Sequence, residues 1–484
     1  MLRNRNLIDK LYSCVTMNME VSYMNNLVRI EQIEINGIKN ILHGEVAFQE
    51  YSEILKGDFD DIRSTFHPVL GIYGQNGSGK SAVLETTKIL KTIMSGECLP
   101  KNIDQYINNE KHEANLIYTF LFIHETNMQL VEYHVKIELE DGNFNITSEK
   151  LLSKSYDKDK KKWKPQVTLI QTDFGDITLK KLKNKISKDL LIELRVVKDM
   201  QKDASFIFYE RNRNSLISEL KDKNEDYLIK TIEVLNIFAQ TGLIIIENDV
   251  MGSINMNTFM PISVYLPVKD SLKLGEIPVN ILEPNEMPLA LFHDMEKIIQ
   301  QIDLVISAII PSLNIQIIHK KEQLLKDGSM GMNFEVVSVR NAKFIPLKYE
   351  SEGIKRIISV TSSLIAAYNN NSLCLMIDEF DSGIYEYLLG ELLEIMNESA
   401  KGQFVFTSHN LRPLEKLSYK SIIFTTVNPT NRFIRLTGVK PNNNIRDYYY
   451  TNIMLGGQSE QLYEETKNYE IKRAFRKAKH ETLK

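Results

Sequence analysis

The stretch GIYGQNGSGKSAVLETTKIL, residues 71–90, decides the fold of this chain. A short apolar run ends at Tyr73, a glycine-rich turn follows, and apolar residues at helical spacing begin after Lys80. The turn, residues 74–81, matches the pattern GxxxxGK[ST] in the strand-turn-helix context that the pattern requires. Glycines let backbone N–H groups turn towards phosphate oxygens, and the helix N-terminus adds partial positive charge. The sequence therefore predicts a phosphate-binding loop.

The side chains of the loop also have chemical roles in this interpretation. Lys80 is expected to reach the β- and γ-phosphates of a nucleoside triphosphate and to assist catalysis, and Ser81 to ligate Mg²⁺. An incidental glycine-rich turn is the alternative, and the helical pattern after the loop favours phosphate binding. The predicted nucleotide-binding residues are Gly74, Gln75, Asn76, Gly77, Ser78, Gly79, Lys80 and Ser81.

A second stretch, SLCLMIDEF at residues 372–380, reads as a buried strand that ends in two carboxylates. Buried carboxylates are costly unless cations or polar partners compensate them. We expect Asp378 to hold Mg²⁺ and Glu379 to polarise the attacking water, which makes Glu379 a predicted catalytic residue. A strand that ends at a solvated acidic turn is the alternative, and the presence of the phosphate loop makes it less favoured.

Two weaker patterns lie where a nucleotide hydrolase could use them. TSHN, residues 407–410, follows an apolar strand and brings His409 to the end of that strand, where sites in parallel sheets gather. YESEGIKRII, residues 349–358, brings Ser351 and Gly353 to the N-terminus of a predicted helix, a second anion-binding geometry. Alone, the first is an ordinary structural histidine and the second a capped helix start.

The order of these four motifs resembles the ABC-type ATPase head. More closely, it resembles the stand-alone prokaryotic ABC-like ATPases of the AAA family grouped with the OLD and abortive-infection ATPases, which are related to RecF and SMC heads. NGIKNI at residues 36–41 is similar to the first-strand pattern of those heads. The resemblance covers residues 27–125 and 310–455. The long interval between the loop and residue 351 is unlike transporter heads and leaves room for an inserted subdomain.

The resemblance implies further site residues and a partner. Ser351 and Gly353 would contact the γ-phosphate bound to a second subunit, so two chains would enclose two ATP molecules with Mg²⁺. Asp381 would be the D-loop aspartate, and His409 the switch histidine that senses the γ-phosphate. Two departures from the family pattern stand out: the signature begins Ser-Glu-Gly, as in the abortive-infection group, and Gln105 is only a poor match for the Q-loop glutamine.

The distribution of strand and helix patterns predicts an α/β fold split in sequence. We expect a P-loop ABC-type head with a mixed sheet, flanking helices and an N-terminal antiparallel part. Alternating patterns at 27–48, 114–125 and 130–153 predict the antiparallel strands. The expected divisions are an N-terminal head part with the loop and β hairpins at 1–204, a mainly helical insertion at 205–310, a C-terminal head part at 311–440 and a helical tail at 441–484.

Composition excludes several other classes of protein. Of the 484 residues, 43% are hydrophobic and 25% charged, and the three cysteines are far apart. Such spacing excludes a disulfide framework or a CxxC metal site and fits a reducing compartment. The apolar runs are too short to cross a bilayer. We therefore expect a cytoplasmic protein with no membrane partner.

The net charge of −4 gives no global reason to expect nucleic-acid binding, so DNA would need a local basic patch. The run 158–164 around Trp163 is one candidate, although charged hairpin tips are commonly just solvated. A predicted C-terminal helix carries the other candidate patch, which is otherwise a solvated face. Its basic residues are Lys472, Arg473, Arg476, Lys477 and Lys479.

Three functions remain open from the sequence. The first is an ATP-gated dimeric switch that works with a separately encoded effector, as the abortive-infection resemblance implies for anti-phage defence. The second is a DNA repair or recombination ATPase of the RecF and SMC kind. The third is a binding module that holds ATP only as a structural ligand, and the presence of Glu379 and His409 argues against it.

Overall fold

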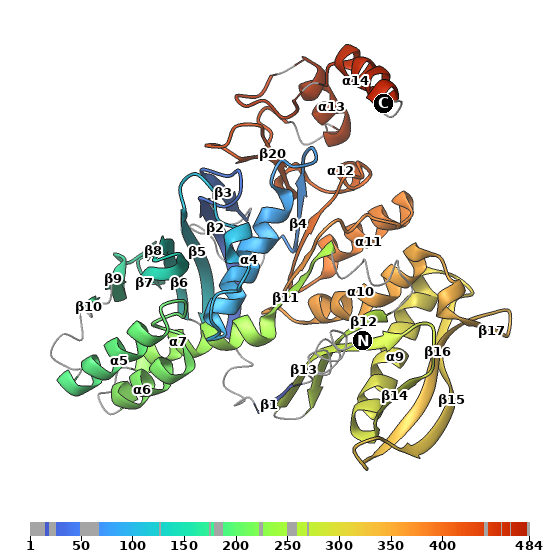
Figure 1. Ribbon diagram of the computed structural model, residues 1–484, viewed down its shortest axis with the longest axis horizontal. Coiled ribbons are helices and arrows are strands. Elements are labelled where there is room, and N and C mark those ends of the chain that lie inside the picture. The colour runs from blue at the N-terminus through green and yellow to red at the C-terminus, as the bar shows by residue number, and fades with distance from the viewer. Residues whose placement is uncertain are drawn as a thin grey trace.

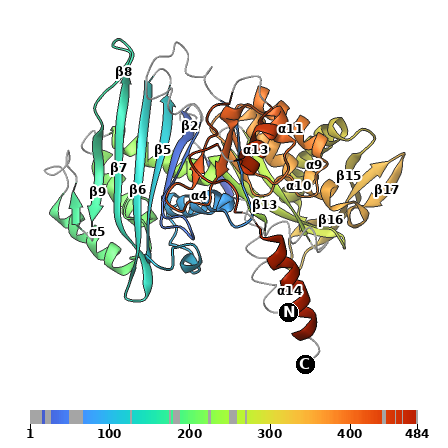
Figure 2. The same ribbon diagram turned by 90° about the horizontal axis from the view of Figure 1, so that it is seen from above.

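The computed structural model of the chain (Figure 1) describes residues 15–18, 26–48, 67–124, 127–173, 176–178, 187–221, 226–248, 259–268, 271–439, 444–455, 457–464 and 466–481. Its centre is a largely parallel sheet, with a large antiparallel sheet on one side and smaller antiparallel sheets on the other (Figure 2). Within these ranges, no helix is both long and apolar enough to span a bilayer.

The central sheet contains the strand before the phosphate loop and the acidic strand. Its strands, in spatial order, are β11 (Leu243–Ile246), β18 (Cys374–Ile377), β19 (Gln403–Thr407), β4 (Val69–Tyr73), β20 (Ile422–Thr425) and β21 (Phe433–Ile434). The first five pair in parallel and β21 is antiparallel. Every residue of β18, β19, β4 and β20 is buried. This burial explains why these strands read as continuous apolar runs.

Alternate residues of these strands face two separate hydrophobic cores. In β4, Leu70 and Ile72 belong to the core shared with the antiparallel sheet, whereas Val69 and Tyr73 belong to the opposite core. The first core is completed by α4 (Lys80–Met94), and the second by α10 (Glu352–Asn369) and α11 (Glu386–Ser399). The expected mixed sheet with flanking helices is therefore confirmed.

The antiparallel sheet arises from the alternating patterns near the N-terminus. Its strands, in spatial order, are β10 (Asp176–Thr178), β9 (Val167–Asp173), β7 (Asn143–Asp157), β6 (Asn127–Glu140), β5 (Glu113–His124), β2 (Asn26–Asn36) and β3 (Gly44–Ala47), and β8 (Lys162–Trp163) pairs with β7. Its inner face packs against α5 (Lys188–Met200), α6 (Glu210–Lys221) and α7 (Asp226–Ile237). The expected strands at 27–48, 114–125 and 130–153 are all present.

Residues 205–310 differ from the mainly helical segment that the sequence led us to expect. Beside α6, α7 and a helical turn at Phe238–Gly242, they contain β11, β12 (Phe259–Val268), β13 (Ser271–Asn280), β14 (Asn285–Pro288) and α9 (Leu289–Ile309). The prolines at 261 and 267 hide the strand pattern of β12, because proline is depleted in strands. β12 lies at the edge of its sheet, where a missing N–H is tolerated.

The remaining elements lie beyond the central sheet and at the C-terminus. β12 and β13 form a sheet with β1 (Val15–Asn18), and a further sheet contains β14, β15 (Asn314–Leu324), β16 (Met330–Arg340) and β17 (Lys343–Pro346). The C-terminal segment contains α13 (Ile445–Leu455) and α14 (Asn468–Glu481), and α14 projects away from the body of the protein (Figure 2).

A buried glutamine joins the two large sheets. β3 pairs with β2 only from Gln32 to Ile35, so the backbone of Ile30 has no β3 partner. Gln403 at the start of β19 fills that position: its Oε1 accepts from the Ile30 N–H at 2.9 Å, and its Nε2 donates to the Ile30 carbonyl at 2.7 Å. The side-chain amide thus replaces a strand neighbour, and only 2% of Gln403 is exposed.

We predict that Gln403→Leu lowers the free energy of unfolding by about 2–4 kcal/mol, because it leaves two buried backbone groups unpaired. Chemical denaturation followed by circular dichroism measures this change. Gln301→Leu, on an exposed position of α9, is the matched control and should change stability by less than about 0.5 kcal/mol. Equal stability of the two variants would contradict the role given to Gln403.

Candidate functional site

The phosphate loop has the backbone shape that its glycines predict. Gly77 and Gly79 have φ values of 77° and 98°, in the region that favours glycine. A Cβ atom on Gly74 would lie 1.7 Å from Thr425 Oγ1, so the approach of β20 also requires glycine there. Thr425 in turn donates a hydrogen bond of 2.5 Å to Ser78 Oγ and fixes the middle of the loop.

Lys80 lies inside the loop. Its Nζ donates to the carbonyls of Gly74 and Gln75, both at 3.0 Å. Burial lowers the pKa of Lys80, while the carboxylates of Asp378, Glu379 and Asp381 oppose that shift. The ammonium group is therefore held between the loop and the acidic residues that follow β18.

Asp378 connects the loop to two neighbouring strands. Its Oδ1 accepts from Ser81 Oγ at 3.1 Å and from Thr407 Oγ1 at 2.6 Å. Ser81 lies in the first turn of α4, and Thr407 ends β19, so the carboxyl ends of adjacent parallel strands meet at this carboxylate. A hydroxyl and a carboxylate side by side are the oxygen ligands that Mg²⁺ takes beside phosphates. The residues present thus fit Mg²⁺.

Glu379 has a constrained backbone. Its φ of 47° is unusual for a residue with a side chain. Its N–H donates to Thr407 Oγ1 at 2.7 Å, and Arg356 Nη2 donates to its carbonyl and to that of Asp378. Its carboxylate oxygen Oε2 accepts from Asn248 Nδ2 at 2.7 Å. Backbone and side chain are thus both held.

Sequence reasoning missed three of these supporting residues. Thr407 stands inside the quoted TSHN motif, but its partner Asp378 becomes visible only when β18 and β19 pair. Arg356 stands inside the signature, and burial lowers its pKa while Asp381, Glu379 and Asp378 oppose the shift. Asn248 follows a strand that the sequence analysis assigned to a helical region.

The signature residues 351–353 lie at the N-terminus of α10, apart from the phosphate loop. Ser351 caps α10 by accepting from the Ile354 N–H at 3.3 Å, and both Ser351 and Glu352 are exposed. Gly353 is buried, and a Cβ atom on it would lie 1.9 Å from the carbonyl oxygen of Gly383. Among the described residues, no hydrogen bond joins Ser351 or Gly353 to the phosphate loop of the same chain.

Asp381 links the turn after β18 to the end of β19. Its Oδ2 accepts from the backbone N–H groups of His409 at 3.2 Å and Asn410 at 2.9 Å. His409 lies two residues after the end of β19, at the strand end where the sequence places it, and its side chain is exposed. The residues after the two strands therefore form one hydrogen-bonded unit.

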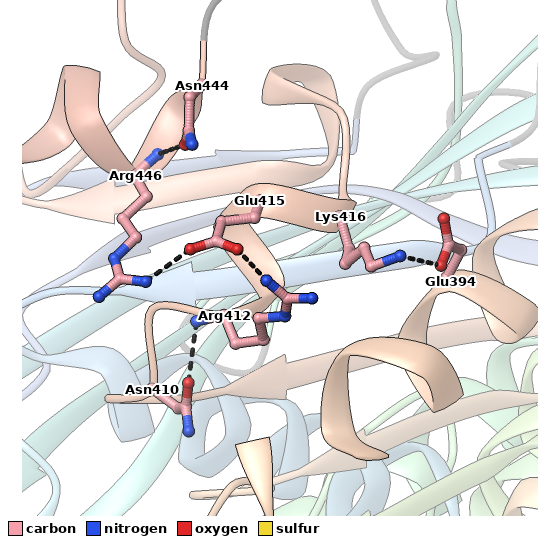
Figure 3. Close-up of polar contacts among 7 residues, drawn as sticks. All are labelled: Glu394, Asn410, Arg412, Glu415, Lys416, Asn444 and Arg446. Atoms are coloured by element: carbon pink, nitrogen blue, oxygen red, sulfur yellow. Dashed lines mark hydrogen bonds and ion pairs between the residues drawn. The ribbon is translucent and has the colours of Figure 1, made fainter. Parts of the chain in front are cut away.

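The loop after His409 is tied to the C-terminal segment by charged side chains (Figure 3). Glu415 of α12 (Pro413–Lys416) pairs with Arg412 and, at 2.5 Å, with Arg446 of α13. Hydrogen bonds from Arg446 and Arg412 lower the pKa of Glu415. Arg412 also lies over the ring of Tyr387, with its guanidinium carbon 4.4 Å from the ring centroid. Helix α13 is thus anchored beside the candidate site.

Gln105 and Gln75 differ in their connections. Gln105 is exposed at the end of a turn of 3-10 helix (Ile103–Gln105), and no hydrogen bond within the described ranges links its side chain to the loop. Gln75 Oε1 instead accepts from the Glu464 N–H at 2.9 Å, so the C-terminal segment reaches the loop.

Comparison with known proteins gives one family match and several similar structures. The family model described as "AAA domain, putative AbiEii toxin, Type IV TA system" matches residues 69–414. A structure of an Smc head bound to the C-winged helix domain of ScpA is 12% identical, with a TM-score of 0.43, and the match covers 84% of this chain and 97% of that one. No curated protein sequence matches the chain.

Two further structures are similar at the same low level. The SMC head domain from Thermotoga maritima is 12% identical with a TM-score of 0.34, and the match covers 84% of this chain and 99% of that one. The recombination mediator RecF with ATP is 14% identical with a TM-score of 0.30, with 79% and 93% covered.

We predict that Gly353→Ala lowers the free energy of unfolding by about 1–3 kcal/mol. The added methyl group would overlap the backbone carbonyl of Gly383, and no side-chain rotation can relieve that overlap. Thermal and denaturant unfolding measure the loss. Glu352→Ala, at the exposed neighbouring position, is the control and should stay within about 0.5 kcal/mol of wild type. If Gly353→Ala is as stable as Glu352→Ala, the contact with Gly383 does not constrain the fold.

Proposed function

The chain belongs to the AAA-domain family whose model matches residues 69–414, and on that premise we propose that it is a Mg²⁺-dependent ATPase that acts as an ATP-gated dimeric switch. The family match confirms the resemblance to ABC-like ATPases. The reaction and the dimer are inferred from the site, and the cellular role is inferred from the family description.

The observation that carries the proposal is the meeting of Ser81 and Asp378 at 3.1 Å. A phosphate loop alone binds phosphates, but hydrolysis also needs a metal ligand and a group that activates water. Asp378 supplies the former and the adjacent Glu379 the latter, next to Lys80. These residues come from distant parts of the chain, which supports a functional assembly over a solvated acidic turn.

Each site residue has a role in this proposal. The loop residues 74–81 hold the triphosphate, and Lys80 neutralises charge on its oxygens. Ser81 and Asp378 hold Mg²⁺, which supplies further neutralisation when bound. Glu379 accepts the proton of the attacking water as general base. His409, after the end of β19, would be the switch histidine that senses the γ-phosphate.

The exposed N-terminus of α10 supports the dimer. Ser351 caps a helix whose positive end faces solvent, and no hydrogen bond in the described part of the chain links it to the phosphate loop. A second chain that presents its own γ-phosphate there would complete two sites, with Ser351 and Gly353 as contacts and Asp381 at the junction. Binding of ATP then closes the dimer, and hydrolysis opens it.

The proposed role is that of the ATPase subunit of a prokaryotic anti-phage system of the abortive-infection type, in the cytoplasm. The description of the matching family supports this assignment. A separately encoded effector would respond to the opening and closing of the dimer. The C-terminal segment could transmit this movement, because it contacts both α12 and the loop residue Gln75.

A DNA repair or recombination ATPase is the second candidate. The exposed lysines at the tip between β7 and β8 favour it, because a local basic cluster is what DNA binding by an acidic chain would require. These lysines are Lys158, Lys160, Lys161, Lys162 and Lys164. Trp163 itself is packed against Tyr156, at 5.2 Å between ring centroids, rather than presented to a base.

We predict that Glu379→Gln lowers the rate of phosphate release about 100-fold or more while retaining ATP, because the general base is lost and the binding groups remain. Light scattering with ATP and Mg²⁺ should then show the mass of two chains for this variant. Lys80→Ala should not change its mass on addition of ATP. An identical mass for Glu379→Gln and wild type with ATP would refute the gated dimer.

The same assay separates the two candidate functions. For the switch, phosphate release is unchanged by duplex DNA at low salt. For the repair ATPase, duplex DNA stimulates phosphate release, and the stimulation falls steeply as salt rises. In that case, replacing the lysines of the hairpin tip by glutamine should remove the stimulation.

A further inference from the structure

We propose that Asn248 is a positioning residue for Glu379 and sets the rate of hydrolysis without contributing to nucleotide binding. This inference rests on the proposed ATPase function. The amide of Asn248 donates from Nδ2 to Glu379 Oε2 at 2.7 Å. Among the described residues, no other side chain forms a hydrogen bond with the carboxylate of Glu379.

The strand register brings the two side chains together. β11 pairs in parallel with β18, and Ile246 is the partner of Ile377. The Asp378 N–H donates to the Ile246 carbonyl at 2.9 Å and extends the pairing by one residue. Asn248 and Glu379 each lie two residues beyond the paired isoleucines. The ladder therefore places the two residues side by side, within reach of a hydrogen bond between their side chains.

The helix that follows the phosphate loop fixes the position of β11. Lys91 of α4 donates from Nζ to the Leu243 carbonyl at 2.7 Å, at the start of the strand. Lys88, one turn earlier in α4, pairs with Glu247 immediately before Asn248. Both ends of β11 are thus attached to the helix that begins with Lys80. Asn248 is held in register with the loop as well as with β18.

The hydrogen bonds around Glu379 leave one of its carboxylate oxygens available to bond a water. Thr407 and Arg356 hold its backbone, so the remaining freedom lies in the side-chain torsions. The bond from Asn248 engages Oε2 and leaves Oε1 to accept from a water. Since an amide is neutral, it orients the carboxylate without the ion pair that a lysine or arginine would form there. Misplacement of a reacting group by about 1 Å can cost up to 100-fold in rate, so such orientation matters.

We expect Asn248→Ala to lower kcat about 10- to 100-fold while KM and the affinity for a fluorescent ATP analogue stay within about twofold. Asn248→Asp keeps the shape but replaces the donor by a second carboxylate, and should lose at least as much kcat. Asn371→Ala, an exposed asparagine in the turn before β18, is the matched control and should behave as wild type.

A double-mutant cycle tests whether Asn248 acts through Glu379. In the Glu379→Gln background, Asn248→Ala should leave the residual single-turnover rate unchanged. An equal loss in both backgrounds, or a parallel loss of nucleotide affinity and melting temperature, would overturn the inference. If wild type releases no phosphate, the proposed function itself fails. If wild type hydrolyses ATP and Asn248→Ala retains its kcat, only the role of Asn248 fails.

Discussion

The hydrogen bonds that Asp378 accepts from Ser81 and Thr407 are the contacts on which the candidate site depends. A carboxylate at the end of a strand buried on both faces is costly unless its oxygens are satisfied. Two hydroxyls satisfy Oδ1 here, and the buried cations Lys80 and Arg356 lie close by. Since each cation is itself desolvated, removing one charge would leave the opposite charges uncompensated. The charges on the phosphate loop, at the end of β18 and on α10 therefore compensate one another.

The central sheet can keep these charged groups in place because it is buried on both faces. Alternate residues of β4 belong to two cores, one with α4 and the antiparallel sheet, the other with α10 and α11. Packing on both sides fixes the strands laterally, and parallel pairing brings their carboxyl ends to one edge. Gln403 extends the same constraint to the antiparallel sheet through its two bonds to Ile30.

The sequence predicted what depends on local pattern. The phosphate loop and the continuous apolar runs of β18 and β19 follow from residue order, and so do the fold class and the family. The residues that support Glu379 depend on register between distant strands, which a single sequence does not contain. Asn248 shows this limit, because β11 has only four residues and lies within residues 205–310, which were expected to be mainly helical. Prolines concealed β12 in the same region, so its sheet could not be foreseen.

The close packing of Gly353 and Gly383 connects the N-terminus of α10 with the turn that follows β18. Gly353 lies against the Gly383 carbonyl, and Asp381, two residues before Gly383, accepts from the backbone of His409 and Asn410. A carbonyl without space around it cannot absorb movement, because dense packing transmits displacement. A group that pushes the N-terminus of α10 towards Gly383 would therefore press on the turn 381–383, which is bonded to the residues after β19. The contact between Gly353 and Gly383 thus joins the N-terminus of α10 to the turn whose Asp381 holds the backbone of His409 and Asn410.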